Sequence, residues 1–282
     1  MVTADTRAAA YGAAKPGDVL ALEGVFEGLS RPPNGVTLDL TAATINGNTR
    51  WDKPADITVK GGLFTSRRPL HCVDGVNVTL DGSRAEGDPI ERDASAFAFV
   101  RGKNLTVRNV SAKSYRNVLT VREIDTFDID GVDGDDILAD VVHATAMWRG
   151  RIVNVQSVAP RPQGDAHPDV LQLISAAGLP PTCDVVLAGI KGQGDTNGIL
   201  LTDKDGMGGY DRITILGVDM ALSRPMGLSA TNVRGLVLGY VSVETLGAVQ
   251  AKIVMRGCTG VAYVGPVTHA AGAGKAAVSF NV

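Results

Sequence analysis

The stretch QGDAHPDVLQLI, residues 163–174, places two aspartates and a histidine directly ahead of a short apolar run. Asp165, His167 and Asp169 alternate along the chain, so in an extended segment two or three of them point to one side. A neighbouring carboxylate favours the protonated form of an imidazole, and one carboxylate close to another can be held protonated. Such groups can act as an acid and base pair on a glycosidic bond, or can abstract the proton next to the carboxylate of a uronic acid. We predict that these three residues are catalytic.

The same stretch has two plainer interpretations, and the sequence leaves both open. Pro168 fixes a turn, and aspartate side chains bond to their own backbone in turns, so GDAHPD could serve only to shape a loop. Alternatively, these residues bind sugar without cleaving it. For His143 a packed histidine, and for the arginines a solvated face, are the corresponding structural interpretations.

Polar residues also stand at both ends of the other short strand-like runs. Stacked strands lie about 4.8 Å apart, so equivalent residues of successive turns form columns. One column, ahead of the runs, contains Arg116, Asn117, His143, Asp165, His167, Asp169, Asp195 and Asn197. A second column, beyond the same runs, contains Arg101, Arg122, Arg149, Asp203, Lys204 and Asp205. The two columns predict a groove that suits an extended sugar chain.

Within this groove the sequence indicates which residues bind substrate. Arg116, Arg149 or Lys204 would neutralise a substrate carboxylate if the reaction removes the proton next to it. The complete predicted binding set is Arg116, His143, Arg149, Asp195, Asn197, Asp203 and Lys204. The loop TDKDGMGGYD looks like a calcium loop but lacks the full ligand spacing and a distal glutamate. We expect no cofactor and no metal ion, with calcium as the alternative.

A repeat would position these columns. The pattern apolar, any, apolar, any, any, small or apolar recurs roughly every 21 to 32 residues. Its copies begin at Ile57, Val78, Leu105, Phe127, Val153, Val185, Ile213, Leu236 and Ala262. Between successive copies lies a second strand-like run, such as NVLTV or NGILLT, with no helical stretch. A β-sandwich is the alternative, but it does not predict a recurring two-strand unit with a fixed internal order. The predicted fold class is all-β, a right-handed parallel β-helix.

The predicted organisation is a single domain over residues 1–282. Residues 1–16, rich in alanine, form a short N-terminal capping helix that closes the end of the coil, and residues 17–282 form its turns. The longest insertions between copies of the repeat are the two polar loops that follow Val153 and Val185. Long loops on a rigid stack are common places for function, so the groove is expected there.

Composition narrows the class of protein. Hydrophobic residues make up 44% and aromatics only 5%, with 34 glycines, so the core must consist of aliphatic side chains joined by tight turns. The net charge of −3 argues against nucleic acid as a partner. The three cysteines lack metal-type spacing and are expected to be small core residues.

No window resembles a membrane span or a signal segment, so we expect no membrane partner. We also expect either that a signal peptide was removed or that the protein reaches its destination without secretion.

The phrase AAKPGDVLALEGVFEG, Ala13 to Gly28, resembles the first turn of right-handed parallel β-helix polysaccharide lyases, including the chondroitinase B and alginate lyase group. The resemblance covers nearly the whole chain as a fold and implies the pectate-lyase-like superfamily, which also contains hydrolases and phage tailspikes. It does not extend to the polygalacturonase motifs, because DTNG at 195–198 is only a loose match and no GHG is present. The calcium and Lys/Arg constellation of the alginate lyase group cannot be placed either.

The expected function is that of a polysaccharide-binding spike or tail component of a phage particle, which binds bacterial surface polysaccharide either with or without depolymerising it. The resemblance implies a homotrimer, or other virion proteins as partners, in a virion or extracellular setting. One alternative is a secreted polysaccharide lyase or glycoside hydrolase. A second is a non-catalytic structural module.

Overall fold

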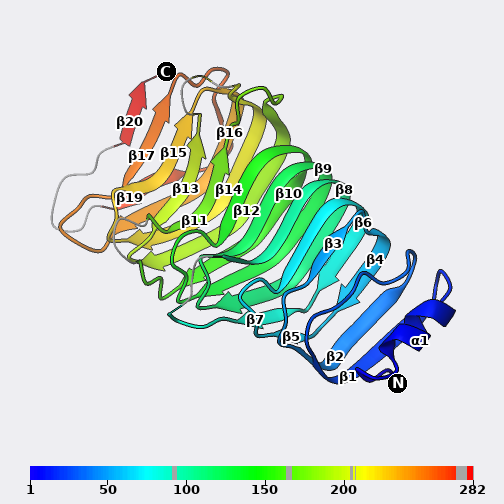
Figure 1. Cartoon of the computed structure of the whole chain (residues 1–282). Helices are drawn as coiled ribbons and strands as arrows, with labels where there is room; N and C mark the ends of the chain where they lie inside the picture. The colour runs from blue at the N-terminus through cyan, green and yellow to red at the C-terminus, as the bar shows by residue number, and fades with distance from the viewer. Residues whose placement is uncertain (91–93, 163–166, 204–205, 207, 271–277, 282) are drawn as a thin grey trace.

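The computed structural model describes residues 1–90, 94–162, 167–203, 206, 208–270 and 278–281. The chain winds into a parallel β-solenoid of about 10 turns (Figure 1). The coil begins with one short helix, α1 (Arg7–Ala13). This confirms the predicted fold class, an all-β coil of parallel strands with a short N-terminal helix.

The strands follow one another along the coil, and each pairs with strands of the turns before and after it. In the first half they are β1 (Val19–Phe26), β2 (Thr37–Ile45), β3 (Arg50–Asp52), β4 (Ala55–Lys60), β5 (Leu63–Phe64), β6 (Leu70–Asp81), β7 (Arg84–Glu86), β8 (Ser95–Lys113), β9 (Asn117–Asp135) and β10 (Val142–Val158). In the second half they are β11 (Asp169–Ile174), β12 (Thr182–Gly194), β13 (Asn197–Thr202), β14 (Tyr210–Leu222), β15 (Met226–Thr231), β16 (Val233–Thr245), β17 (Lys252–Arg256), β18 (Ala262–Tyr263), β19 (Val267–Ala270) and β20 (Val278–Asn281).

Strand β9 shows how the sequence makes a turn of the coil. Its alternating apolar side chains point inward, and Leu119 and Ile129 are fully buried. The strand bends where the backbone takes a positive φ, at Glu123 (56°), Thr126 (62°) and Gly131 (75°). These bends let one strand pass around the core without a separate loop, so each turn presents outward residues on several faces.

Inward residues of successive turns stack in register to form the core. Isoleucine, leucine and valine repeat at one position of the turn, and burial of each such side chain contributes roughly 1.5–3 kcal/mol. One fully buried column consists of Val107, Ile129, Ile152, Leu187, Ile215 and Leu238. The core is therefore a set of aliphatic rows along the axis of the coil.

At one turn the predicted repeat was wrong by three residues. The sequence pattern began this copy at Val153, whereas in the structure Gly150 pairs with Phe127 and Ile152 with Ile129. A Cβ atom at Gly150 would lie 2.2 Å from the Phe127 carbonyl oxygen and 2.7 Å from the Cγ atom of its ring. The phenylalanine ring fills the space of the missing side chain, so the apolar pattern is interrupted where it was expected to begin.

The N-terminal segment covers one end of the coil, as Figure 1 shows. The Val2 amide donates a hydrogen bond to the Ala21 carbonyl (2.7 Å), and the Arg7 guanidinium donates one to the Gly28 carbonyl (2.6 Å). Ala10 and Tyr11 pack against the core. In the described part of the chain, no helix is long and apolar enough to cross a membrane.

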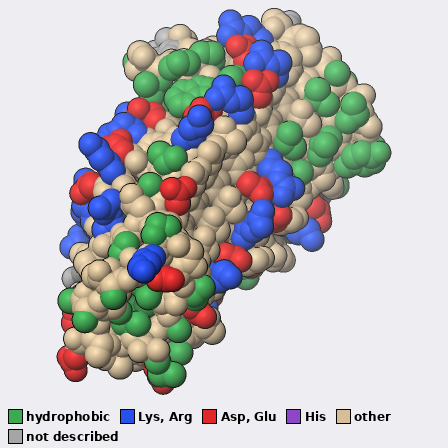
Figure 2. Space-filling model, turned by 90° about the vertical axis from the view of Figure 1, so that its right-hand side faces the viewer, with side chains coloured by type: hydrophobic (Ala, Val, Ile, Leu, Met, Phe, Trp, Pro, Cys, Tyr) green, Lys and Arg blue, Asp and Glu red, His purple; other side chains and the backbone are tan. Residues whose placement is uncertain are grey.

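Arginine and aspartate side chains on neighbouring turns form ion pairs across the outer surface. Representative pairs are Arg101–Asp74 (2.7 Å), Arg151–Asp128 (2.6 Å) and Arg212–Asp184 (2.5 Å). Figure 2 shows a face on which Lys and Arg side chains lie next to Asp and Glu side chains. Such exposed pairs contribute only about 0.2–1 kcal/mol each. They therefore support the alignment of adjacent turns, while most of the stability comes from the buried core.

Candidate functional site

A groove of about 540 Å³ lies on the outer surface where the segments that lead into β9, β10 and β11 meet these strands. One of its lining residues, His167, directly follows the undescribed residues 163–166 in the sequence. Its polar lining includes Arg116, Asn117, Asp140, His143, His167 and Gln172. The structure thus brings together three residues that the sequence singled out, Arg116, His143 and His167.

The floor of the groove contains one outward residue from each of three adjacent strands. Thr120 of β9 pairs with His143 of β10, and His143 pairs with Gln172 of β11. Paired residues of neighbouring strands lie about 4.8 Å apart, so the three side chains form a row along the axis of the coil. This row can contact successive parts of an extended ligand.

His143 is oriented by a carboxylate. Its Nδ1 atom lies 2.7 Å from Oδ2 of Asp140, and its side chain is 28% exposed, while that of Asp140 is 7% exposed. The Asp140 amide donates a hydrogen bond to Oδ1 of Asn117 (3.0 Å), which fixes the backbone at this point. A carboxylate on Nδ1 selects the tautomer with the proton on that atom, so Nε2 is left as a proton acceptor.

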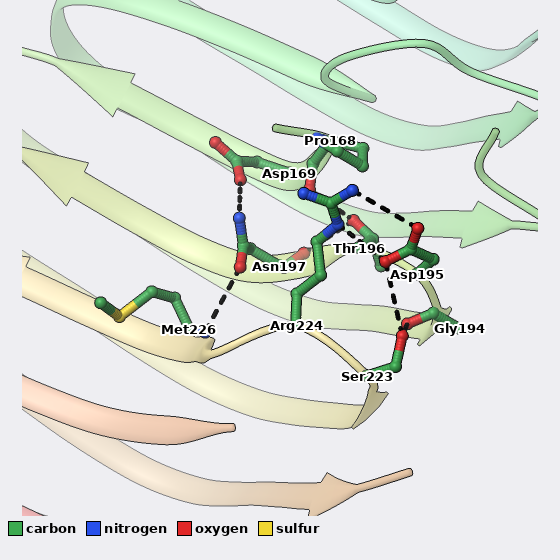
Figure 3. Close-up of polar contacts among 9 residues, drawn as sticks. All are labelled: Pro168, Asp169, Gly194, Asp195, Thr196, Asn197, Ser223, Arg224 and Met226. Carbon is green, nitrogen blue, oxygen red and sulfur yellow. Dashed lines mark hydrogen bonds and ion pairs between the residues drawn. The ribbon is translucent and has the colours of Figure 1, made fainter. Parts of the chain in front are cut away.

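Asp140 belongs to a column of polar residues at the start of successive strands. The register places Asn117, Asp140, Asp169 and Asn197 in line, one per turn. Asn197 donates a hydrogen bond from Nδ2 to Oδ1 of Asp169 (2.9 Å) and accepts one from the Met226 amide (3.3 Å), as drawn in Figure 3. Amides therefore flank a pair of carboxyl groups on adjacent turns.

The carboxyl group of Asp169 is enclosed. The residue is 1% exposed, and its Oδ2 atom has no hydrogen-bond partner among the described residues. Burial, and then the nearby charge of Asp140, raise the pKa of Asp169 to about 8, against the lowering effects of the Asn197 hydrogen bond and the Arg224 charge. A carboxyl group in this environment is protonated at neutral pH.

Arg116 is the cationic side chain of the groove. Its backbone is held by the hydrogen bond from its amide to the Ala94 carbonyl (3.0 Å) and by the one from the Ala139 amide to its own carbonyl (2.8 Å). Its guanidinium forms no hydrogen bond or ion pair with any residue that the structure describes. Among the described residues nothing neutralises Arg116, which distinguishes it from the paired arginines of the outer surface and suits it to bind an anionic group.

Four of the residues predicted to bind substrate make structural contacts and do not line this groove, and one of them is Asn197, whose bonds to Asp169 and Met226 are given above. Arg149 forms an ion pair with Asp125 of the preceding turn, six residues beyond His143 along β10. The carboxylate of Asp195 accepts a hydrogen bond from Nε of Arg224 (2.8 Å; Figure 3).

Asp203, the fourth of these residues, is buried. It accepts hydrogen bonds from Oγ of Ser175 (2.5 Å) and Nδ2 of Asn232 (2.7 Å). The remaining predictions, Asp165, Lys204 and Asp205, lie outside the described residues. Among the described residues no cluster of three or more His, Cys, Asp or Glu side chains could hold a metal ion.

Sequence reasoning missed Asp140, which links His143 to the column of carboxyl groups. The segment DGDDILAD offers four aspartates within eight residues, so no single one stands out. A weak signal was present, because the dipeptide Asp-Val occurs at Asp140-Val141 and Asp169-Val170, close to the start of β10 and β11, although it also occurs at Asp18-Val19 and, inside β12, at Asp184-Val185. Alignment of these two dipeptides would have placed both aspartates in one column.

No family model, curated protein or solved structure matches the chain. What is established about the class of this protein is therefore its fold, a parallel β-solenoid. The function has to be argued from the groove and from the residues that line it.

Proposed function

We propose that the protein binds a uronic acid polysaccharide in this groove and cleaves it by β-elimination, with His143 as the base. The observation that carries the proposal is the contact of 2.7 Å between Nδ1 of His143 and Asp140, which leaves Nε2 as the acceptor in a groove that also contains Arg116, whose guanidinium has no partner among the described residues. A base and a carboxylate-binding cation side by side are what this elimination requires.

The proposed reaction uses one proton transfer at each end. Nε2 of His143 removes the proton from C5 of the uronate, next to its carboxylate, while the guanidinium of Arg116 stabilises the negative charge that develops on that carboxylate. The electron pair forms the C4–C5 double bond, and the bond between C4 and the glycosidic oxygen breaks. The leaving oxygen takes a proton from His167, the second imidazole of the groove.

Elimination agrees with the described groove better than hydrolysis does. A glycoside hydrolase needs two carboxyl groups facing the scissile bond. Asp140 is the one carboxylate among the described residues that line the groove, and it is engaged with His143. Asp169 is enclosed behind it. The substrate class also agrees with the resemblance of residues 13–28 to the pectate-lyase-like superfamily, to which we assign the chain as part of this proposal.

The test is an assay on a panel of uronate polymers, such as pectate, alginate and hyaluronan, with neutral glucans beside them. Ultraviolet absorbance reports the unsaturated uronate, and a reducing-sugar assay reports all chain breaks. The two signals should rise together on at least one uronate polymer. His143→Ala should lower the rate about 10²–10⁴-fold because the base is lost.

A matched pair of arginine variants provides the control. Arg116→Gln should slow the reaction at least about tenfold, because the cation leaves the groove. Arg149→Gln removes an exposed ion pair elsewhere on the coil and should leave the rate within about twofold. Reducing ends without ultraviolet absorbance would mean hydrolysis, and inactivity on every uronate polymer would refute the proposed activity.

A further inference from the structure

We infer that Asp169 is a positioning residue that stays protonated and donates a hydrogen bond from its carboxyl group to Asp140, so that His143 is held as a neutral base. Its role in catalysis rests on the proposed function. Its protonation state and the proposed bond to Asp140 do not, because they are argued from the burial of Asp169 and from the register of two adjacent turns.

The geometry leaves Asp169 one direction in which to donate. One oxygen, Oδ1, already accepts a hydrogen bond from Asn197 (2.9 Å), and Figure 3 shows the other carboxyl oxygen pointing away from Asn197. That oxygen, Oδ2, is buried and without a partner among the described residues. The register places Asp140 directly across from Asp169, at the spacing of about 4.8 Å between paired strands. A proton on Oδ2 would allow Asp169 to donate a hydrogen bond to Asp140, so that every polar group of this column has a partner.

Charge makes the protonated state the stable one. Two ionised carboxylates on adjacent turns, both nearly excluded from water, repel each other and lose their hydration. One proton shared between them removes the repulsion and converts it into a strong hydrogen bond between an acid and a carboxylate. The raised pKa of Asp169 agrees with this arrangement. Asp140, which holds His143, keeps the negative charge.

The consequence for His143 is a matter of how much negative charge surrounds it. A second ionised carboxylate one turn away would favour the imidazolium form, which cannot accept a proton. A neutral Asp169 avoids this while it still holds Asp140 in place. Among the described residues, the other charged or titratable groups around this cluster are Arg116 and His167 in the groove, Arg122 on β9, and Asp195 and Arg224 beyond Asp169.

The experiment compares the same substitution at the two neighbouring aspartates. The chain has four histidines, so the ring signals of His143 can be followed by NMR and assigned with His143→Ala. Asp169→Asn should leave the titration midpoint of His143 unchanged, because it replaces a neutral group by a neutral group. Asp140→Asn should lower that midpoint by about one pH unit or more, because it removes a real charge. A comparable fall in Asp169→Asn would overturn the inference.

A second measurement needs no variant that might fail to fold. Carbon-13 NMR of the aspartate carboxyl groups in the unaltered chain should show one of them releasing its proton above pH 7. If every aspartate titrates below about pH 5, where ordinary aspartates do, the inference is wrong. Neither measurement uses a substrate. Inactivity on all polymers would therefore refute the proposed lyase activity but not the bond between Asp169 and Asp140. Normal titration of Asp169 would refute that bond but not the lyase activity.

Discussion

Aspartates in this protein differ in charge state because their surroundings differ. The pKa of Asp128 is lowered by the hydrogen bond from Arg151 and further by Arg108, in an exposed cluster on the outer surface. The pKa of Asp169 is raised, because burial withdraws its carboxyl group from water and Asp140 adds a like charge. Aspartate is therefore an anion in the ion pairs of the outer surface and a protonated acid in the buried column of polar residues.

The buried acid has a consequence for stability. An unfolded aspartate titrates near about 4, whereas folded Asp169 titrates at about 8. Between these values the unfolded chain has lost a proton that the folded chain keeps, so this group lowers the free energy of unfolding as the pH rises through that window. Asp169→Asn cannot ionise and should remove that loss, on the order of 3–4 kcal/mol between pH 5 and pH 8.

Urea unfolding of both proteins at pH 5 and pH 8 checks this prediction. Asp128→Asn is the matched control, because the depressed pKa of Asp128 places its own titration below this window. It should change the free energy of unfolding equally at both values of pH. If Asp169→Asn and the unaltered chain lose stability in parallel, Asp169 is not a buried acid.

Single residues of the site were only partly predictable. Arg116, His143 and His167 stood out because their types suit the chemistry, and the structure places them in one groove. The sequence does not show which arginines are neutralised by partners on other turns, as Arg149 is by Asp125. It also gave no sign that Asp169 is enclosed, since burial depends on how the segments before the strands fold over it.

At the level of strands, small residues are needed wherever a large side chain of the adjacent turn takes the available space. Gly150 lies against the carbonyl and ring of Phe127. Because this position carries no apolar side chain, the predicted copy of the repeat was placed three residues too late. The last copy, at Ala262, was also displaced, by one residue, because Ala262 pairs with Val237 and is exposed. In the other turns alternation of buried and exposed residues was sufficient to predict the coil, because inward residues recur at a fixed place. Element type was thus predictable, while register at Gly150 depended on one contact between turns.

This contact can be tested with a single methyl group. Gly150→Ala places its Cβ atom 2.2 Å from the Phe127 carbonyl oxygen, a backbone atom that cannot give way cheaply. The turn must shift, and we expect a loss of about 1–3 kcal/mol in the free energy of unfolding. Thermal and urea unfolding measure it.

Gly12 in α1 offers the control for this test. A Cβ atom there has nothing within 4 Å, and alanine is the better helix former. Gly12→Ala should therefore be neutral or stabilising, by up to about 1 kcal/mol. Equal effects of the two substitutions would show that the packing of Phe127 does not depend on the glycine.

For the whole molecule, the ends of the coil matter most, because a parallel stack leaves the hydrogen-bonding groups of its outermost strands unpaired. Residues 1–16 meet this need at β1 through the backbone bonds of Val2 and the apolar contacts of α1. Neighbouring turns supply the remaining stability, so an exposed first turn weakens the end of the stack and invites association with other chains.

Removal of residues 1–16 should therefore produce larger assemblies than the full chain forms at equal concentration, as measured by light scattering. The truncated chain with Val19→Lys provides the comparison, since Val19 lies in β1 and is 63% exposed. A lysine on an edge strand opposes pairing with another chain and should reverse the association. If the truncated chain keeps the mass distribution of the full chain, the helix does not protect this edge.

The row of Thr120, His143 and Gln172 gives the ligand surface a modular character, since each turn supplies a single residue to it. Duplication of a whole turn after β11 would lengthen the surface by one contact while the neighbours of His143 stay as they are. Duplication between β9 and β10 would instead separate Thr120 and Arg116 from His143. The ligand surface can therefore be extended by added turns on the C-terminal side of β11. On the N-terminal side of β10 an added turn would disrupt the groups around His143.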